Sequence, residues 1–535
     1  MPVNEDNNNS NNEGVISEEP QPHPVFEQLP GIQYCINSPP PLLESISLGF
    51  QHYVLSLGSI VLIPSMLVPQ MGGTDKDKAK VIQTLLFVSG VNTLLNSFFG
   101  TRLPSVIGGS YAFLIPATSI IHSRRYRTIH PPEQRFVQTM REIQGALILA
   151  SCFQMIIGFT GLWRIIARYF TPLSMVPLVT FTGLGLYHLG FPLIATCFEV
   201  GIPQLILLFI ISQFSPRFIK LRRPICDRYA FLLSAAIVWI YTEILTWSGA
   251  FTKAKKAMCR SDGSGLIGAA PWLYMPFPFQ WGPPTFRAGE IFAAMVASFV
   301  ASTESTGSFV SAARYGSATP VPASVISRGV GWLGIGTLLN ALFGSVTCST
   351  ATVENAGLLA LTKAGSRRVV QISSAFMILF SILGKFGAIF ASIPLPIMAA
   401  SYCVFFGYVS SAGLGFLQFC NLNSFRTKLI LGFSFFIGLS LPQYFREHHL
   451  NSQTGPVHTP AEWFNDIMSI IFTSHATVAA VVALVLDCTL HHGTDEAHKD
   501  NGSYWWNKFM VYNRDVRNDE FYKLPGQLNR CFPSL

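Results

Sequence analysis

Long apolar stretches recur along the whole chain and are separated by polar connections. A membrane-spanning helix needs about 20 mostly apolar residues. The stretches that approach this length predict fourteen segments, at 46–69, 80–100, 103–121, 142–160, 172–190, 201–216, 229–249, 289–312, 328–344, 349–363, 369–391, 395–416, 427–443 and 467–489. Two of them, 103–121 and 349–363, are short and rich in Gly, Ser and Thr, so we expect them to be interrupted.

One motif occurs twice, as TLLNSFFG at 93–100 and as TLLNALFG at 337–344, with an offset of 244 residues. The copies close the second and the ninth predicted segment. The ninth segment comes seven positions after the second, and seven is odd, so the two copies cross the membrane in opposite directions. Chance likeness between two Leu-rich helix ends is the alternative. Because each copy leads directly into an interrupted segment, the pattern favours an inverted repeat, which is typical of secondary transporters.

The predicted fold is therefore an all-α membrane protein with a 7+7 inverted repeat. The repeats cover residues 41–250 and 289–490, and 251–288 form an extracellular loop. Unpaired backbone in lipid is costly. Segments 3 and 10 are therefore each expected to be a short β-strand plus a half-helix, crossing each other. The half-helix N-termini would offer free N–H donors and positive dipole ends to a ligand.

Both ends of the chain are expected in the cytoplasm. Residues 1–40 are polar, Asn-rich and acidic, which predicts a disordered N-terminal tail, and 491–535 form a C-terminal tail. With this orientation the short cytoplasmic connections carry the basic residues at 217–228, 363–368 and 426–428, as the positive-inside rule requires. The loops at 122–141 and 250–288 are also basic, but long loops follow the rule poorly.

Composition narrows the class of protein. Half of the residues are hydrophobic and only 12% are charged, about half the usual fraction of charged residues in soluble proteins. The net charge of +8 lies largely in connections, so it does not indicate nucleic acid. The ten Cys have no metal-ligand spacing and are expected to be reduced thiols rather than a disulfide framework. With no P-loop, nucleophile–base pair or metal cluster, we predict neither an enzyme nor a cofactor.

Two carboxylates, Glu304 and Glu354, lie in apolar segments. A charge at the membrane centre costs about 2.5–3.5 kcal/mol on insertion scales, so it is usually functional; the alternative is a buried carboxylate bonded to backbone. Small residues surround Glu304, and Ser308 shares its helix face. A carboxylate shielded from water can also bind and release a proton, which suits proton coupling.

The residues near Glu354 suit a planar ring with alternating N–H and C=O groups. Glu accepts from N–H, and the amide of Asn355 can both donate and accept. Tyr111 could stack on the ring, and Ser110 aligns with Glu354 under the 244-residue offset. A plain anion would be repelled by Glu354. The binding prediction therefore names Glu304, Glu354, Asn355, Tyr111, Ser110 and Ser308.

Other polar and aromatic residues receive structural interpretations. His52 in the first segment is expected to be a satisfied structural residue rather than a proton relay. Asn96 and Asn340, which end the two repeated motifs, are expected to cap or bridge helices. Three aromatic residues of the twelfth segment are expected to be ordinary packing rather than a gate: Phe405, Phe406 and Tyr408.

The stretch ENAGLLALTKAGSRRVV at 354–370 resembles the signature of the nucleobase–ascorbate transporters, also called nucleobase cation symporter family 2. Glu354, Asn355, Gly357, Thr362 and Lys363 fill its positions. Three further motifs resemble those of the family: QH at Gln51 and His52, GGSYAF at 108–113 and ESTGS at 304–308. The likeness spans roughly residues 40–490, and the length and tails resemble the plant branch.

The resemblance implies a core domain of segments 1–4 and 8–11, and a gate domain of segments 5–7 and 12–14 that mediates homodimerisation. Substrate would bind between them, and the core would move as an elevator. Glu304 and Glu354 would hold the base, Asn355 would order the site, and Tyr111 with Ser110 would contact the ligand. Lys363 would tune selectivity.

Two positions bear on the ion and the substrate that the resemblance implies. Many relatives have Asp or His where Ser308 stands, which puts the ion coupling in doubt. Ascorbate carriers of the family tend to have Pro at the position of Glu354, so Glu favours nucleobases.

The sequence thus predicts a plasma-membrane importer of xanthine, uric acid, uracil or a related base, coupled to a proton or to Na⁺. One alternative is an ascorbate or other organic-anion carrier of the same fold, which a competition assay would distinguish. The other is a membrane receptor without transport activity, which would bind without accumulating its ligand.

Overall fold

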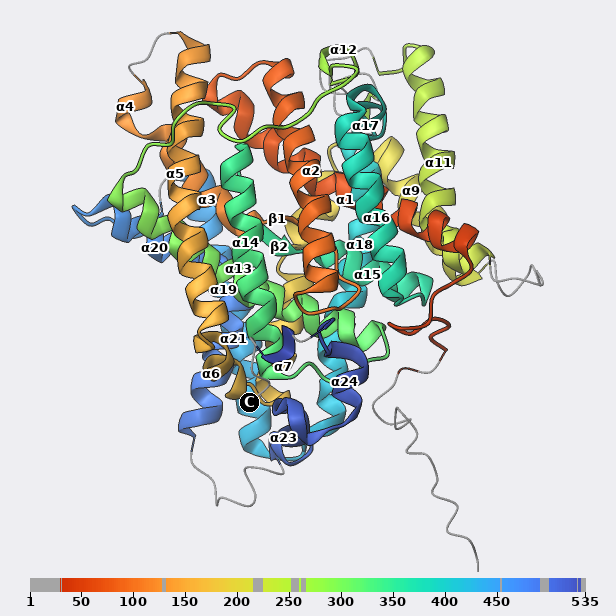
Figure 1. The fold of residues 1–535 in the computed structure, drawn as a ribbon, viewed down its shortest axis with the longest axis vertical. Coiled ribbons are helices and arrows are strands. Elements are labelled where there is room, and N and C mark those ends of the chain that lie inside the picture. Colours follow the sequence, from red (N-terminus) through yellow and green to blue (C-terminus); the bar gives the residue numbers. More distant parts are fainter. Residues whose placement is uncertain are drawn as a thin grey trace, which may run out of the picture.

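The computed structural model describes residues 29, 31–127, 131–214, 225–251, 259–260, 266–452, 455–490, 500–526 and 528–530, and this part is almost entirely helical (Figure 1). It has eight helical stretches long and apolar enough to cross a membrane: Leu42–Met71, Asp75–Phe98, Pro132–Phe159, Pro172–Ile194, Arg228–Trp247, Ala323–Phe343, Leu395–Phe419 and Phe425–His449. Two sharply bent pairs raise the number to ten: Arg367–Ile382 with Gly384–Ala391, and Trp463–Thr473 with His475–Thr489. Fourteen spans therefore stay a prediction.

Two short strands cross at the centre of the molecule. β1 (Ile107–Gly109) pairs antiparallel with β2 (Ser349–Ala351), and Gly108 lies opposite Thr350. A short helical stretch follows each strand: η1 (Tyr111–Phe113) and α3 (Leu114–His122) after β1, and α15 (Val353–Thr362) after β2. Both interrupted segments thus have the expected strand and helix.

Asparagines in and next to the repeated motifs bind β2 and the end of α2. Asn340 Nδ2 donates to Ser349 Oγ of β2 over 2.9 Å, and Asn92 Nδ2 does the same. Asn96 Oδ1 accepts from the backbone N–H of Thr101 over 2.8 Å, at the end of α2. The expected capping and bridging roles of Asn96 and Asn340 are confirmed.

The long helices form two groups. We call the first the crossing bundle because it surrounds the strands; it contains α1 (Leu42–Met71), α2 (Asp75–Phe98), α3, α5 (Pro132–Phe159), α13 (Ala288–Tyr315), α14 (Ala323–Phe343), α15 and α16 (Arg367–Ile382). We call the second the flanking bundle; it contains α7 (Pro172–Leu184), α9 (Phe198–Phe209), α11 (Ile225–Trp247), α18 (Leu395–Leu414), α19 (Phe425–Ser452) and α21 (His475–Thr489). α20 (Glu462–Thr473), which precedes α21, also belongs to the flanking bundle. The two bundles meet where α15 packs on α18, and where α13 packs on α7 and on α20.

Some predicted boundaries were wrong. α5 begins at Pro132, ten residues before the predicted start. The predicted start was too late because Glu133, Arg135 and Arg141 make the first turns of this helix polar. The segment predicted at 467–489 is broken at Ser474, where α20 ends and α21 begins with a bend of 80°. Serine favours a break here because its side chain caps the following helix.

The last part of the expected disordered tail packs against the protein. The side chain of Ile36 is 1% exposed, and its backbone N–H donates to Gly316 O over 3.2 Å. Residues 1–28 and 30 lie outside the described part of the chain.

A disulfide joins Cys197 and Cys259, whose Cα atoms are 5.5 Å apart. The expectation of reduced thiols was therefore wrong for this pair. The fold brings the start of α9 beside the loop that follows α11, although 62 residues separate the two Cys in sequence. The described cysteines that are free are Cys35, Cys152, Cys348, Cys403, Cys420 and Cys488.

Candidate substrate site

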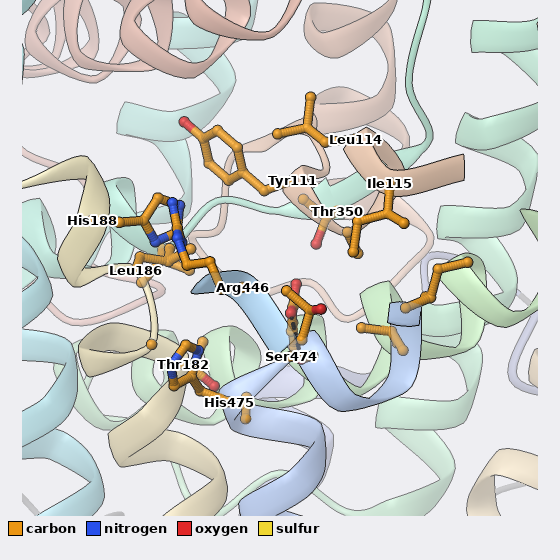
Figure 2. A pocket seen from close by; sticks show the side chains of 18 of the residues that line it. Tyr111, Leu114, Ile115, Thr182, Leu186, His188, Thr350, Arg446, Ser474 and His475 are labelled. Atoms are coloured by element: carbon orange, nitrogen blue, oxygen red, sulfur yellow. Dashed lines mark hydrogen bonds between the residues drawn. The ribbon is translucent and has the colours of Figure 1, made fainter. Parts of the chain in front are cut away.

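A cavity of about 240 Å³ lies between the two bundles (Figure 2). The crossing bundle lines it with the stretches that follow both strands and with part of α13, and the opposite wall comes from α7, α19, α20 and α21. Its volume falls below the roughly 300 Å³ at which sites for drug-sized ligands begin. The cavity is therefore suited to a small ring compound.

Both predicted carboxylates line this cavity. Glu354 lies in the first turn of α15 and is 2% exposed; its Oε1 accepts from Ser59 Oγ of α1 over 2.7 Å. The free N–H groups and the dipole at a helix N-terminus stabilise a carboxylate there. Because a carboxylate has about four acceptor positions, Glu354 retains capacity to bind a ligand.

Glu304 approaches the cavity from α13. Its Oε1 accepts from Ser474 Oγ over 2.8 Å. Ser474 also caps α21, since its side chain accepts from the backbone N–H of Thr477. One serine therefore links the carboxylate of the crossing bundle to a helix start of the flanking bundle.

Tyr111 forms part of the cavity wall at the short helical turn after β1 (Figure 2). Its hydroxyl has no hydrogen-bond partner among the described residues. Buried tyrosine hydroxyls usually find a partner. A ligand in the cavity is a candidate for that role.

Asn355 does not line the cavity, because its amide is directed to neighbouring residues. Its Nδ2 donates to Ser56 Oγ over 2.8 Å and to Thr352 Oγ1 over 2.9 Å, and its Oδ1 lies 2.9 Å from His52 Nδ1. These contacts fix the start of α15 against α1. His52 is buried and hydrogen-bonded, as a structural residue would be. Its structural role and the direct contact of Asn355 with substrate stay predictions.

The other predicted residues also lie outside the cavity wall. The backbone N–H of Ser110 donates to Cys348 O over 3.1 Å, and Ser308 is buried in α13. Gln51 Nε2 donates to Arg228 O over 3.0 Å, and Thr362 Oγ1 donates to Leu358 O over 2.8 Å. Lys363 is exposed and ends α15 with a φ of 54°. Their effects on substrate selectivity or binding stay predictions.

Gly357 permits the close approach of α15 and α18. A Cβ at this position would lie 2.3 Å from Phe405 O. Phe405 is fully buried and contacts Phe231. Phe405, Phe406 and Tyr408 do not line the cavity, so their interpretation as packing is confirmed.

The flanking wall of the cavity was not predicted from the sequence. Arg446 and His188 lie beside each other there, with His475 and Thr182 nearby (Figure 2). A signal was present in FTSHAT at 472–477, where Ser and His interrupt an apolar run. Arg446 lies just beyond the predicted end of its segment, and α19 carries it to the cavity because the helix continues to Ser452. One guanidinium, that of Arg446, thus lines the cavity together with the two carboxylates.

Known proteins with similar sequences identify the family of this chain. The model of a family described as Permease family matches residues 43–447. Nucleobase-ascorbate transporter 4 of Arabidopsis thaliana is 58% identical over 517 residues, with 96% of this chain and 98% of the relative covered. Nucleobase-ascorbate transporter LPE1 of Zea mays is 51% identical, with 96% and 98% covered.

Similarity to solved structures is weaker than similarity to these relatives. The transmembrane domain of the cyanobacterium bicarbonate transporter BicA aligns with a TM-score of 0.39 and 12% identity, covering 83% of this chain and 97% of that chain. The family assignment rests on the sequence comparisons. The chain belongs to the plant nucleobase–ascorbate transporter family, and it is a multi-pass membrane transporter rather than an enzyme.

Proposed function

We propose that this transporter imports nucleobases such as xanthine, uric acid or uracil by proton symport. The observation that carries the proposal is the cavity with Glu304 and Glu354 on one wall and Arg446 on the other. An oxidised base has ring N–H groups, which can donate hydrogen bonds to carboxylates. It also has carbonyl groups, which can accept hydrogen bonds from a guanidinium. Tyr111 supplies an aromatic face and a hydroxyl beside them.

The position of the cavity supports transport by relative movement of the bundles. In this proposal the crossing bundle is the core domain and the flanking bundle is the gate domain of a 7+7 inverted repeat. Movement of one past the other would expose the cavity alternately to the two sides. A proton carried by Glu304 or Glu354 would neutralise a charge that is costly at membrane depth. We place a homodimer in the plasma membrane, with both termini in the cytoplasm.

A second candidate is transport of ascorbate or another organic anion. The relatives have ascorbate in their names. The guanidinium of Arg446 on the cavity wall is a group that pairs with anions. Glu354 in the same cavity opposes an anion, which is why nucleobases remain the first candidate.

Uptake of labelled xanthine tests the proposal in cells that lack their own base carriers. We expect uptake that rises at acidic external pH, collapses with a protonophore and is inhibited by unlabelled uracil or uric acid. Inhibition by ascorbate alone would favour the second candidate. No uptake of any base by protein at the cell surface would overturn transport of nucleobases.

The substitution Glu354→Gln tests the site. It removes a charge-assisted hydrogen bond to the base, worth about 1.5–3 kcal/mol, so we expect KM for the base to rise more than tenfold. Glu447→Gln is the control, because Glu447 is exposed and bonds to Gln443 on its own helix. Equal KM values in wild type and Glu354→Gln would reject the assignment.

A further inference from the structure

The C-terminal segment connects both bundles at one end of the molecule, where α23 (Ser503–Met510) and α24 (Arg517–Tyr522) lie (Figure 1). Its first part binds the flanking bundle. The backbone N–H of Asn421 donates to Asp500 O over 3.0 Å, and that of Leu173 donates to Asn501 O over 3.3 Å. The ring of Trp505 stacks on Phe419 with centroids 3.6 Å apart.

Its second part binds the crossing bundle. Arg328 of α14 donates from Nη2 to Tyr522 O over 2.9 Å, and Arg367 of α16 donates from Nη2 to Phe521 O over 3.0 Å. Thr319 Oγ1 donates to Oδ1 of Asn518, a side chain with no exposed surface. Buried guanidinium groups need such partners. The contacts with Arg328 and Arg367 therefore stabilise the second part of the segment on the crossing bundle.

The connection between the two anchors is itself ordered. Asn518 Nδ2 donates to Tyr512 O over 3.0 Å, and the guanidinium of Arg517 lies over the ring of Phe509, 5.9 Å from its centroid. Arg517 also bonds to Asp515, and these bonds hold the pKa of the Asp515 carboxyl below its usual value. The segment therefore links the bundles as a folded unit rather than as an extended linker.

We propose that residues 500–524 form a strap that restrains the two bundles and slows transport until its second part detaches. This inference rests on the proposed relative movement of the bundles. The detaching part is residues 512–524, because Tyr512 packs with α14 of the crossing bundle and only residues 490–499 separate the first anchor from α21, which belongs to the flanking bundle. Release of 512–524 frees the crossing bundle while the first anchor stays with the flanking bundle.

A reversible cross-link tests the strap. The double variant Thr319→Cys with Asn518→Cys places two thiols where a hydrogen bond of 2.9 Å now joins the side chains. After oxidation we expect base uptake to fall about tenfold, because the strap cannot detach, and to recover after reduction. Each single variant, treated identically, controls for the native cysteines. Unchanged uptake by the fully cross-linked protein would overturn the proposal.

Weakening the second anchor gives the opposite expectation. Tyr522→Phe removes the hydrogen bond from its hydroxyl to Thr319 O and is expected to raise the maximal uptake rate roughly threefold to tenfold, with KM unchanged. Val516→Ala, at a side chain that is 88% exposed, is the control. Equal rates in wild type and Tyr522→Phe would contradict the strap. Absence of base uptake by the wild type would instead reject the proposed function.

The rate of maleimide labelling measures release of the strap without a transport assay. In Asn518→Cys the thiol replaces a fully buried side chain. Labelling of this thiol in isolated membranes therefore requires release of the second anchor. We expect adding Tyr522→Phe to accelerate labelling about tenfold. The exposed thiol of Val516→Cys should be labelled at the same rate with and without Tyr522→Phe. Equal labelling rates of Asn518→Cys with and without Tyr522→Phe would overturn the strap.

Discussion

At the scale of single residues, the site separates groups that face the cavity from groups that hold them in place. Glu304, Glu354 and Tyr111 reach the cavity. Asn355 and His52 bind each other one layer behind Glu354. Both kinds belong to recognisable motifs, so a motif alone does not tell which residue touches a ligand.

Gly357 gives a prediction about packing. In Gly357→Ala the new Cβ would lie 2.3 Å from Phe405 O, which is backbone and cannot rotate away. We expect the free energy of unfolding to fall by about 1–3 kcal/mol, as for overpacked cores. Melting temperatures of the purified protein in detergent would measure this.

Gly407→Ala is the matched control, since Gly407 lies in α18 and a Cβ there would meet no atom within 4 Å. Alanine at an open helical position is neutral or stabilising. Equal melting temperatures for both variants would show that α15 and α18 are less closely packed than described.

Only part of the site could be predicted, because only some of its residues produce a local pattern in the sequence. A carboxylate in an apolar segment is visible in sequence, so Glu304 and Glu354 were found. The flanking wall was not, because Arg446 lies beyond the predicted end of its segment and becomes part of the cavity only through the length of α19. Contacts between distant segments, such as that of Glu304 with Ser474, leave no local pattern.

At the scale of elements, breaks in helices create the polar surface of the cavity. The interrupted segments after β1 and β2 were predictable, because Gly, Ser and Thr replace long apolar residues there. The break between α20 and α21 was missed, because only Ser474 and His475 mark it within an apolar run. Two polar residues change the hydropathy of a segment little, although one of them caps a helix.

Ser474 therefore gives a prediction at this scale. Ser474→Ala removes the cap of α21, worth about 1 kcal/mol, and the donor to Glu304. We expect a lower melting temperature and a changed KM for the base. Ser474→Thr keeps the hydroxyl and should restore both values.

Ser392→Ala is the control for loss of a buried hydroxyl, because Ser392 Oγ donates within its own helix end to Ile389 O. It should leave KM unchanged. Ser474→Ala with wild-type KM and stability would show that the contact with Glu304 has no role in the site.

At the scale of the whole molecule, connections tie the two bundles together at more than one place. The disulfide fixes the loop after α11 to the start of α9 in the flanking bundle. The same loop then docks on the crossing bundle, where the backbone N–H of Tyr274 donates to Ile382 O over 3.0 Å and that of Thr285 to Arg141 O over 3.0 Å. The loop is thus held by the flanking bundle at Cys259 and by the crossing bundle at Tyr274 and Thr285.

The disulfide also tests the predicted orientation, which places both of its cysteines outside the cell. Disulfides persist in oxidising compartments and are rare in the cytosol. We expect a membrane-impermeant maleimide to label intact cells at Cys197 and Cys259 only after an impermeant reductant has been added. The double variant Cys197→Ser with Cys259→Ser should show no such gain. Labelling of the pair without reductant would argue against the bond. Absence of any gain in intact cells, with a gain in opened membranes, would place this face in the cytoplasm and reverse the orientation of every segment.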